Sequence, residues 1–366
     1  MIQRLFIVLL LRLLGGAFDS PAQTLNTDLS AHILWEVELP NLHASSLSTA
    51  TVDKNGDLWF VTDFPESSRL AHLTSNGKLV SAMEFPASFG PRPPADVSEF
   101  ALAVLPSGTI GLLARYDHAS GKRIYFDGAA FARLDAEEVG IPKDIAGAGP
   151  EYKGFLALND EHFLVMGDQS PLVLIRIDAR GEKTWRRSLP SSWVLPSGAA
   201  LENGQSCIVS PEYGAPRLHL VRLDRSGSIQ HRAEISARRG LATSGPDGSC
   251  VILYDRGRES QRYDFFLTDL DASFKRQWTV PVRFDRPWGG TFHLVTTSDG
   301  YLVVADATKV LGPLFIGKYD FSGHLLWSLI DKSRHAPSLV AAQAEAFYLV
   351  GAGLDGHDSL SVIRGH

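Results

Sequence analysis

The chain has 366 residues, of which 44% are hydrophobic and 21% are charged, a composition ordinary for a globular protein with a substantial core. Its formal net charge of −6 argues against a nucleic-acid-binding domain, which needs a basic surface. The 33 glycines and 20 prolines indicate many turns without the low complexity of a disordered chain.

The N-terminal residues have the pattern of a secretory signal peptide. Arg4 precedes an apolar run over 5–14 that is short for a membrane span. The small residues "SPA" at 20–22 offer a cleavage site. We therefore predict a signal peptide over 1–22, a mature domain over 23–366 and a periplasmic or secreted location; an uncleaved anchor is the alternative.

One sequence pattern then recurs along the chain: an alternating apolar run, a turn that contains glycine, and a second alternating run. It reads "LAHLTSNGKLVSAMEFP" at 70–86, "LIRIDARGEKTWRRSLP" at 174–190, "LVRLDRSGSIQHRAEI" at 220–235 and "IGKYDFSGHLLWSLI" at 316–330. Six copies are marked by the residue four past the turn glycine or its equivalent, and a degenerate copy lies near Val139; the six are Trp35, Ser81, Trp185, His231, Trp278 and Trp327. Their spacing of 46 to 58 residues predicts four-stranded propeller blades.

The unit around 174–190 shows how each repeat divides into four strands. The strands are expected at 153–158, 163–168, 172–178 and 183–189, each about six residues long and bounded by turn residues. No segment has a sustained 3.6-residue apolar period, so helices should be scarce. The tryptophans at the anchor position are expected to pack between neighbouring blades, with each indole N–H finding a partner.

The two ends of the chain complement each other. Residues 359–366 match a third strand and its turn, after which the chain stops, whereas 32–40 match a fourth strand with no third. Pairing them would close a ring and remove exposed sheet edges. The fold class is therefore an all-β single propeller, with seven blades expected and six or eight left open because 87–150 is irregular.

The two cysteines, Cys207 and Cys250, each follow a turn and sit in an apolar strand. They fall in neighbouring repeats, whose sheets should lie about 10 Å apart. A disulfide needs Cα atoms within about 7 Å, so two buried free thiols are the favoured interpretation. An exported location would permit a disulfide, and that alternative stays open.

The recurring pattern apolar-x-apolar-Asp-x-x-Gly-x-x-x-Trp resembles the repeat of pyrroloquinoline-quinone-type propellers. The resemblance covers most of the chain and implies the fold alone. The spacing from Asp178 to Gly181 is one residue shorter than is usual in that family, and the adjacent cysteines of the quinone-dependent enzymes are lacking. No cofactor is therefore expected. "NGDLWFVTD" at 55–63, together with 70–86, is similar to one blade of the streptogramin-lyase type of propeller.

No nucleophile elbow, phosphate loop or zinc-ligand spacing is found in the sequence. "DKNGD" at 53–57 places oxygens at alternate positions but lacks the remainder of a calcium loop, including its closing glutamate. Asn55-Gly56 between two apolar strands predicts a hairpin turn. No metal site is expected.

The connections predict two different rims of the ring. First-to-second and third-to-fourth strand connections are tight and form one rim, here called the turn rim. The other connections are longer and form the long-loop rim, including "RYDHASGKRIYFDG" at 115–128 and "SPEYGAPR" at 210–217. Long loops on a rigid scaffold are where function concentrates. The candidate ligand-binding residues there are Arg115, Trp193, Tyr213, Arg256, Arg258, Arg262, Arg283, Arg286, Trp288 and His335.

Arginine and tryptophan are enriched at binding hot spots, and the arginine fork suits carboxylate, sulfate or phosphate groups. The first hypothesis is an exported, non-catalytic, monomeric scaffold that holds a protein partner or an anionic ligand, such as a polysaccharide, on the long-loop rim. The alternative is an enzyme, a lyase or hydrolase, with its site in the central funnel of that rim. A third possibility is a solvated rim whose arginines pair with Asp255, Asp264 and Asp285.

Overall fold

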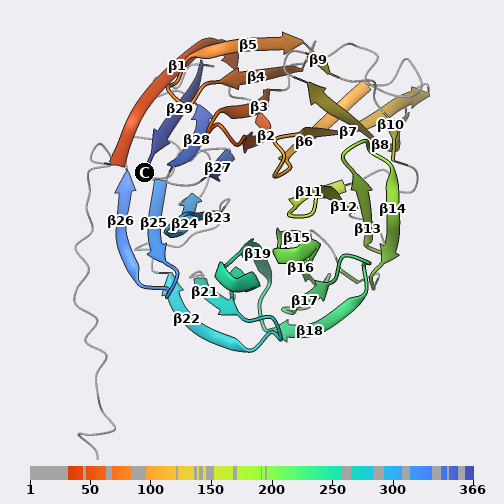
Figure 1. Ribbon diagram of the computed structural model, residues 1–366, viewed down its shortest axis with the longest axis vertical. Coiled ribbons are helices and arrows are strands. Elements are labelled where there is room, and N and C mark those ends of the chain that lie inside the picture. The colour runs from red at the N-terminus through yellow and green to blue at the C-terminus, as the bar shows by residue number, and fades with distance from the viewer. Residues whose placement is uncertain are drawn as a thin grey trace, which may run out of the picture.

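The computed structural model describes residues 32–43, 47–62, 68–84, 96–120, 123–135, 138–139, 143–145, 152–167, 171–190, 192–193, 196–256, 265–282, 292–306, 314–331, 339–343, 346–352 and 359–366. Within them, seven antiparallel sheets form a ring around one axis, a β-propeller (Figure 1). This confirms the predicted all-β, seven-bladed fold. Helical structure in the described residues is confined to the three-residue 3-10 turns Glu202–Gly204 and Pro246–Gly248 and to the single residue His32. None of them forms a helix long and apolar enough to cross a membrane.

Five of the blades are regular meanders whose first strand lies nearest the axis and whose fourth lies at the periphery (Figure 1). Blade 1 contains β2 (Leu47–Val52), β3 (Leu58–Thr62), β4 (Arg69–Leu73) and β5 (Leu79–Glu84). Blade 3 contains β11 (Tyr152–Leu158), β12 (His162–Gly167), β13 (Val173–Asp178) and β14 (Lys183–Ser188). Blade 4 contains β15 (Ser197–Ala200), β16 (Ser206–Pro211), β17 (Leu218–Leu223) and β18 (Ile229–Ile235). Blade 5 contains β19 (Arg239–Ser244), β20 (Cys250–Asp255), β21 (Phe265–Leu270) and β22 (Arg276–Val282). Blade 6 contains β23 (Phe292–Thr297), β24 (Gly300–Asp306), β25 (Leu314–Asp320) and β26 (Leu325–Asp331).

Blade 7 is built from both ends of the chain. It contains β27 (Leu339–Gln343), β28 (Ala346–Ala352) and β29 (Ser359–Gly365), and its fourth strand is β1 (Ile33–His43). β1 runs antiparallel to β29 and places Trp35 opposite Arg364. The predicted closure of the ring by the N-terminal strand is confirmed.

Blade 2 departs from the regular plan. It contains β6 (Asp96–Val104), β7 (Ile110–Ser120) and β8 (Arg123–Asp135), and two short strands, β9 (Glu138–Val139) and β10 (Lys143–Asp144), both pair with β8. The expectation of a loop over 115–128 is wrong, because β7 and β8 continue as a hairpin to the pair Ser120–Arg123. An alternating polar and apolar stretch can extend a sheet beyond the core, and its composition alone resembles that of a loop.

The apolar residues gather between blades rather than within them. Seven clusters of buried side chains each combine residues of two neighbouring blades. Val61 of blade 1 shares a cluster with Leu112 of blade 2, for example, and Val251 of blade 5 with Val303 of blade 6. Each repeat therefore depends on its neighbours for its core, as expected for stacked repeats.

The repeated sequence pattern forms the same turn, between the third and fourth strands, in several blades on the turn rim. The aspartate at the end of the third strand accepts hydrogen bonds from the backbone N–H groups two and four residues on, at 2.8–2.9 Å. These aspartates are Asp178, Asp224, Asp271 and Asp320. The residue three past each aspartate has a positive φ, which favours glycine; blade 5 alone among these four places a phenylalanine, Phe274, there.

An anchor tryptophan ties the turns of blades 1, 4 and 6 to the preceding blade. Trp185 of blade 3 donates its indole N–H to the carbonyl of Arg225 in the turn of blade 4, at 2.9 Å. Its ring packs over Gly227, where a Cβ would lie 2.9 Å from the indole. Trp35 makes the same pair of contacts with Ser75 and Gly77 of blade 1. The predicted inter-blade role of these tryptophans is confirmed, although their rings are half-buried.

Cys207 and Cys250 form a disulfide between blades 4 and 5, with 6.4 Å between their Cα atoms. The favoured interpretation of two free thiols was therefore wrong. The cluster around the bridge also contains Ala199 and Ala242, one from each blade. Small side chains on the facing strands let these two sheets approach more closely than the usual sheet spacing of about 10 Å.

Candidate binding surface on blades 4 and 5

A pocket of about 450 Å³ lies on the long-loop rim where blade 3 leads into blade 4. Its lining includes Trp193 from the connection between the blades, Glu212 after β16, His219 on β17 and Arg232 and Glu234 on β18. Of the residues that line this pocket, only Trp193 is among the candidates predicted from the sequence. Its other polar residues could have been found from β17, where His219 interrupts the apolar sequence "LHLVRL".

His219 organises the floor of this pocket. Its Nε2 lies 3.2 Å from an oxygen of Glu212 and its Nδ1 lies 3.3 Å from an oxygen of Glu234. Arg217 also approaches both carboxylates, at 3.3 and 3.6 Å. His219 and Arg217 therefore both lie against the carboxylates of these two glutamates. The charged side chains at the floor of the pocket pair with one another, which favours a role in positioning a ligand over a role in acid–base catalysis.

Trp193 is buried, which contradicts its expected place on an exposed loop. Only 4% of its surface is exposed, and its ring stacks on His219 with 4.6 Å between centroids. Trp193 also forms an isolated β-bridge with Glu212. The cause is a long-range contact: the chain between blades 3 and 4 folds back against the loop after β16, which covers the indole.

Tyr213 has the exposure that the sequence suggested. Its side chain is 82% exposed, and the next residue, Gly214, has a φ of +77° with open space around it. The Tyr213 N–H donates to the carbonyl of Ser192, at 2.7 Å. The structure therefore brings the segments of Trp193 and Tyr213 together, with the tyrosine projecting from the surface beside the pocket.

The same surface continues into blade 5. The N–H of Ala237 donates to the carbonyl of Pro216, which joins the loop of Tyr213 to the connection between blades 4 and 5. There, Asp255 is fully buried and accepts a 2.9 Å hydrogen bond from Nε of Arg239. The guanidinium of Arg239 lies 5.3 Å from the ring of Phe292. The predicted pairing of rim arginines with Asp255 is thus correct for Arg239.

Arg256, next to Asp255, lies over an aromatic ring. Its guanidinium carbon is 4.6 Å from the centroid of Phe266, and the residue is exposed. Stacking fixes one face of the group and leaves its N–H edge available for bidentate contacts. We call the exposed residues Tyr213, Arg238 and Arg256, with the pocket beside Trp193, the blade 4–5 surface.

The other predicted site residues cannot be placed on this surface. Arg115 belongs to β7, opposite Ala129 of β8, and its side chain lies outside the described residues. Six further candidates lie wholly outside them: Arg258, Arg262, Arg283, Arg286, Trp288 and His335. Their role in binding stays a prediction.

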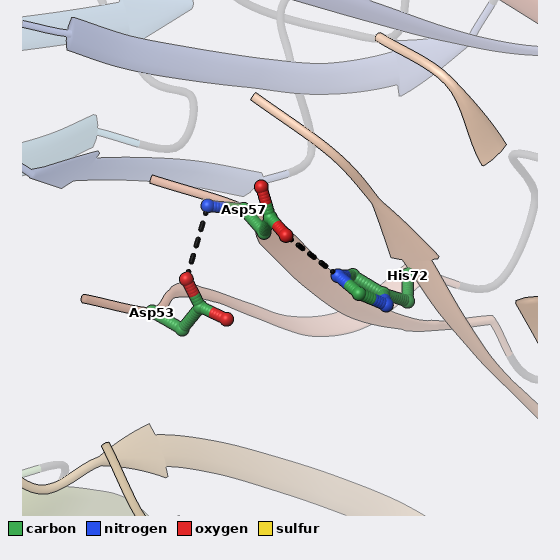
Figure 2. Close-up of side chains that lie close together, drawn as sticks. All are labelled: Asp53, Asp57 and His72. Atoms are coloured by element: carbon green, nitrogen blue, oxygen red, sulfur yellow. Dashed lines mark hydrogen bonds and ion pairs between the residues drawn. The ribbon is translucent and has the colours of Figure 1, made fainter. Parts of the chain in front are cut away.

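Asp53, Asp57 and His72 on the turn rim of blade 1 are close enough together to hold a metal ion (Figure 2). Their hydrogen bonds argue for a structural role instead. Asp53 accepts from the N–H groups of Asn55 and Asp57, at 2.8 and 3.1 Å, and from the indole of Trp59. Asp57 lies 3.1 Å from Nε2 of His72, as Figure 2 shows, and accepts from the N–H of Ser75 at 2.8 Å. The cluster braces the predicted hairpin at Asn55-Gly56.

Comparison with known proteins supports the fold and no specific activity. No family model and no curated protein matches the chain. Among solved structures, the β-propeller domain of the Trilobed protease from Pyrococcus furiosus is similar with a TM-score of 0.55 and 11% identity, covering 87% of this chain and 94% of that one. The Dos1 propeller has a TM-score of 0.54 and 9% identity, over 89% and 93%. YCF48 bound to D1 peptide has a TM-score of 0.54 and 9% identity, over 90% and 96%. At these identities the likeness shows a β-propeller; membership of the pyrroloquinoline-quinone-type family is not established by it.

Proposed function

We propose that the protein is an exported, non-catalytic and monomeric binding scaffold, and that the blade 4–5 surface holds an acidic protein partner or an anionic ligand. The observation that carries this proposal is the arrangement around Asp255. One buried carboxylate anchors the loop of Arg238 and the side chain of Arg239, while Arg256 is stacked on Phe266. Guanidinium groups held in place before binding lose less conformational freedom when an anion arrives.

Two further features support the proposal. The exposed Tyr213, whose loop is hydrogen-bonded to the segment that precedes Arg238, is a residue type enriched at binding hot spots. The disulfide between Cys207 and Cys250 is the kind of bond that persists in oxidising compartments, which agrees with the signal peptide predicted over 1–22. It also joins the two blades that carry the surface, so the surface is presented on a cross-linked pair of sheets.

The proposal is tested by reversing two exposed charges. The double variant Arg238→Glu and Arg256→Glu leaves Arg239 and its bond to the buried Asp255 untouched. Titration of a polyuronate and of an acidic peptide should show binding weakened by about a hundredfold, because two charge-assisted contacts of roughly 1.5 kcal/mol each are lost. The loss should be larger at low salt, where screening is least.

The matched control is Arg180→Glu with Arg225→Glu, two exposed arginines in turns on the opposite rim. It makes the same change in net charge and should bind like the wild type. Equal binding by the wild type and both double variants would overturn the proposal. Turnover of the acidic ligand by the wild type would favour the catalytic alternative.

A further inference from the structure

One position of the repeat carries a basic residue in six of the seven blades. It lies in the third strand, two residues before the residue that begins the turn. The six basic residues are His72, Arg133, Arg176, Arg222, Lys318 and Arg364. Blade 5 has an aspartate there, Asp269. Asp269 is 7% exposed, about as buried as Arg176, Arg222 and Lys318.

In blades 3, 4 and 7 the basic side chain links its own blade to the next one. Arg176 of blade 3 donates to the carbonyl of Arg225 in blade 4, the same oxygen that accepts the indole of Trp185. Arg364 of blade 7 donates at 2.9 Å to the carbonyl of Ser75, which also accepts the indole of Trp35. A positive charge therefore lies beside the anchor tryptophan and the carbonyl of the following turn.

In blades 4 and 6 the basic side chain also contacts the turn between the first and second strands of its own blade. Arg222 donates to the side-chain oxygen of Gln205, at 2.7 Å, and Lys318 approaches Asp299 at 2.6 Å. Arg176 and Arg222 each contact oxygen atoms of two blades: Arg176 contacts Asp160 and the carbonyl of Arg225, and Arg222 contacts Gln205 and the carbonyl of Gly248.

In blade 5 the oxygen atoms of this site are retained and the basic side chain is not. The carbonyl of Phe321 in blade 6 accepts the indole of Trp278, at 3.1 Å, as its counterparts do. Ser249 belongs to the first turn of blade 5, and Tyr301 to blade 6. Oδ1 of Asp269 and the hydroxyl of Tyr301 are buried and have no hydrogen-bond partner among the described residues, and the hydroxyl of Ser249 adjoins the Asp269 carboxylate.

The oxygens of Ser249 and Tyr301 lie close together beside Gly245. A Cβ built on Gly245 would clash with Oγ of Ser249 and lie 3.0 Å from the Tyr301 hydroxyl. Burial raises the pKa of Asp269, and it also raises the pKa of Tyr301, with a further contribution from the charge of Asp269. Among the described residues, no ion pair joins this buried carboxylate to a basic side chain.

We propose that an alkali-metal cation, Na⁺ or K⁺, binds between blades 5 and 6 at Asp269, Ser249, Tyr301 and the carbonyl of Phe321, in the place that a basic side chain occupies in other blades. All four ligands are oxygens, the donors that hard cations prefer. A single carboxylate balances one positive charge, whereas Ca²⁺ sites use 6–8 oxygens and commonly several carboxylates. The inference concerns the turn rim and is independent of the proposed binding surface.

The test is thermal unfolding in NaCl, KCl and choline chloride at equal ionic strength. A ligand that binds only the folded state raises its stability with concentration, so the wild-type Tm should be higher in NaCl or KCl than in choline chloride. Asp269→Asn should abolish the difference. Asp269→Lys supplies the cation from the chain, as Lys318 does in blade 6, and should fold without responding to the alkali salts.

Asp224→Asn is the matched control, because it removes one carboxylate from an exposed turn of blade 4; it should keep the alkali response. Crystals soaked in RbCl should show an anomalous peak between Asp269 and Tyr301. The proposal is overturned if the wild-type Tm is the same in all three salts, or if the soaked crystals show no peak at this place. A response that survives in Asp269→Asn would also overturn it.

Discussion

Trp193 and Tyr213 lie next to each other in the fold and differ in what their side chains do. Trp193 is packed between blades 3 and 4 and stacks on His219, whereas Tyr213 is 82% exposed. Trp193→Ala should therefore cost about 3–5 kcal/mol of unfolding free energy, as for other large-to-small core changes. Tyr213→Ala should change stability by no more than about 0.5 kcal/mol. Urea unfolding of both variants checks this, and equal stabilities would contradict the assigned burial.

The misplacement of Trp193 shows where sequence reasoning ends at this scale. The segment "PSSWVLPSG" at 190–198 has the composition of an exposed loop. Nothing in this local sequence predicts the β-bridge between Trp193 and Glu212. Burial there depends on a contact made with a later part of the chain. Tyr213 was placed correctly because a turn of the type "EYGA" projects from the surface whatever its tertiary neighbours.

At the scale of a single turn, a comparison of Gly227 with Gly214 separates backbone strain from the packing of a tryptophan ring. Both have a positive φ, at +78° and +77°, so alanine should cost each about 1–2 kcal/mol of backbone strain. Only Gly227 receives a tryptophan ring, and a Cβ there would lie 2.9 Å from Trp185. Gly227→Ala should therefore cost roughly 1–3 kcal/mol more than Gly214→Ala. Similar losses in the two variants would mean that the docking of Trp185 contributes little.

The aspartate of the same turn predicts a pH dependence. Burial of the Asp224 carboxyl acts to raise its pKa, but hydrogen bonds from Ser226, Ser228 and Gln230 outweigh burial and hold the pKa below its usual range. A carboxyl whose pKa is lowered by folding contributes stability above its unfolded pKa and loses it as the pH falls through its folded pKa. The stability difference between the wild type and Asp224→Asn should therefore shrink as the pH falls from 5 to 3. Urea unfolding at stepped pH checks this, and a constant difference would contradict it.

Elements of this kind are the most predictable part of the chain. The aspartate, the glycine three residues on and the tryptophan four beyond it are local requirements of one turn and its neighbour, so they recur visibly in the sequence. The basic residue two before the turn, and Asp269 in its place, are equally visible in the sequence, but their role depends on contacts with other segments that the sequence does not show. The hairpin over 115–128 could not be foreseen, since its pairing extends beyond the core.

The whole ring was predictable because it is a sum of such local units and because the two ends lack complementary strands. The distance between blades was not, since it depends on the sizes of the side chains that face each other. Two cysteines in neighbouring repeats therefore form a disulfide that a general sheet spacing argued against. Of the residues in the proposed blade 4–5 surface and its pocket, Trp193, Tyr213 and Arg256 are among the candidates predicted from the sequence.

The closure of the ring by β1 is tested most directly by comparing the thermal unfolding of residues 23–366 with that of residues 41–366. Removal of the strand takes Trp35 from Ser75 and Gly77 and leaves β29 as an open edge. Many inter-strand bonds and an inter-blade core are lost together, so the shorter protein should unfold at a much lower temperature or aggregate. An unchanged unfolding midpoint would contradict a ring whose last blade is completed by the N-terminal strand.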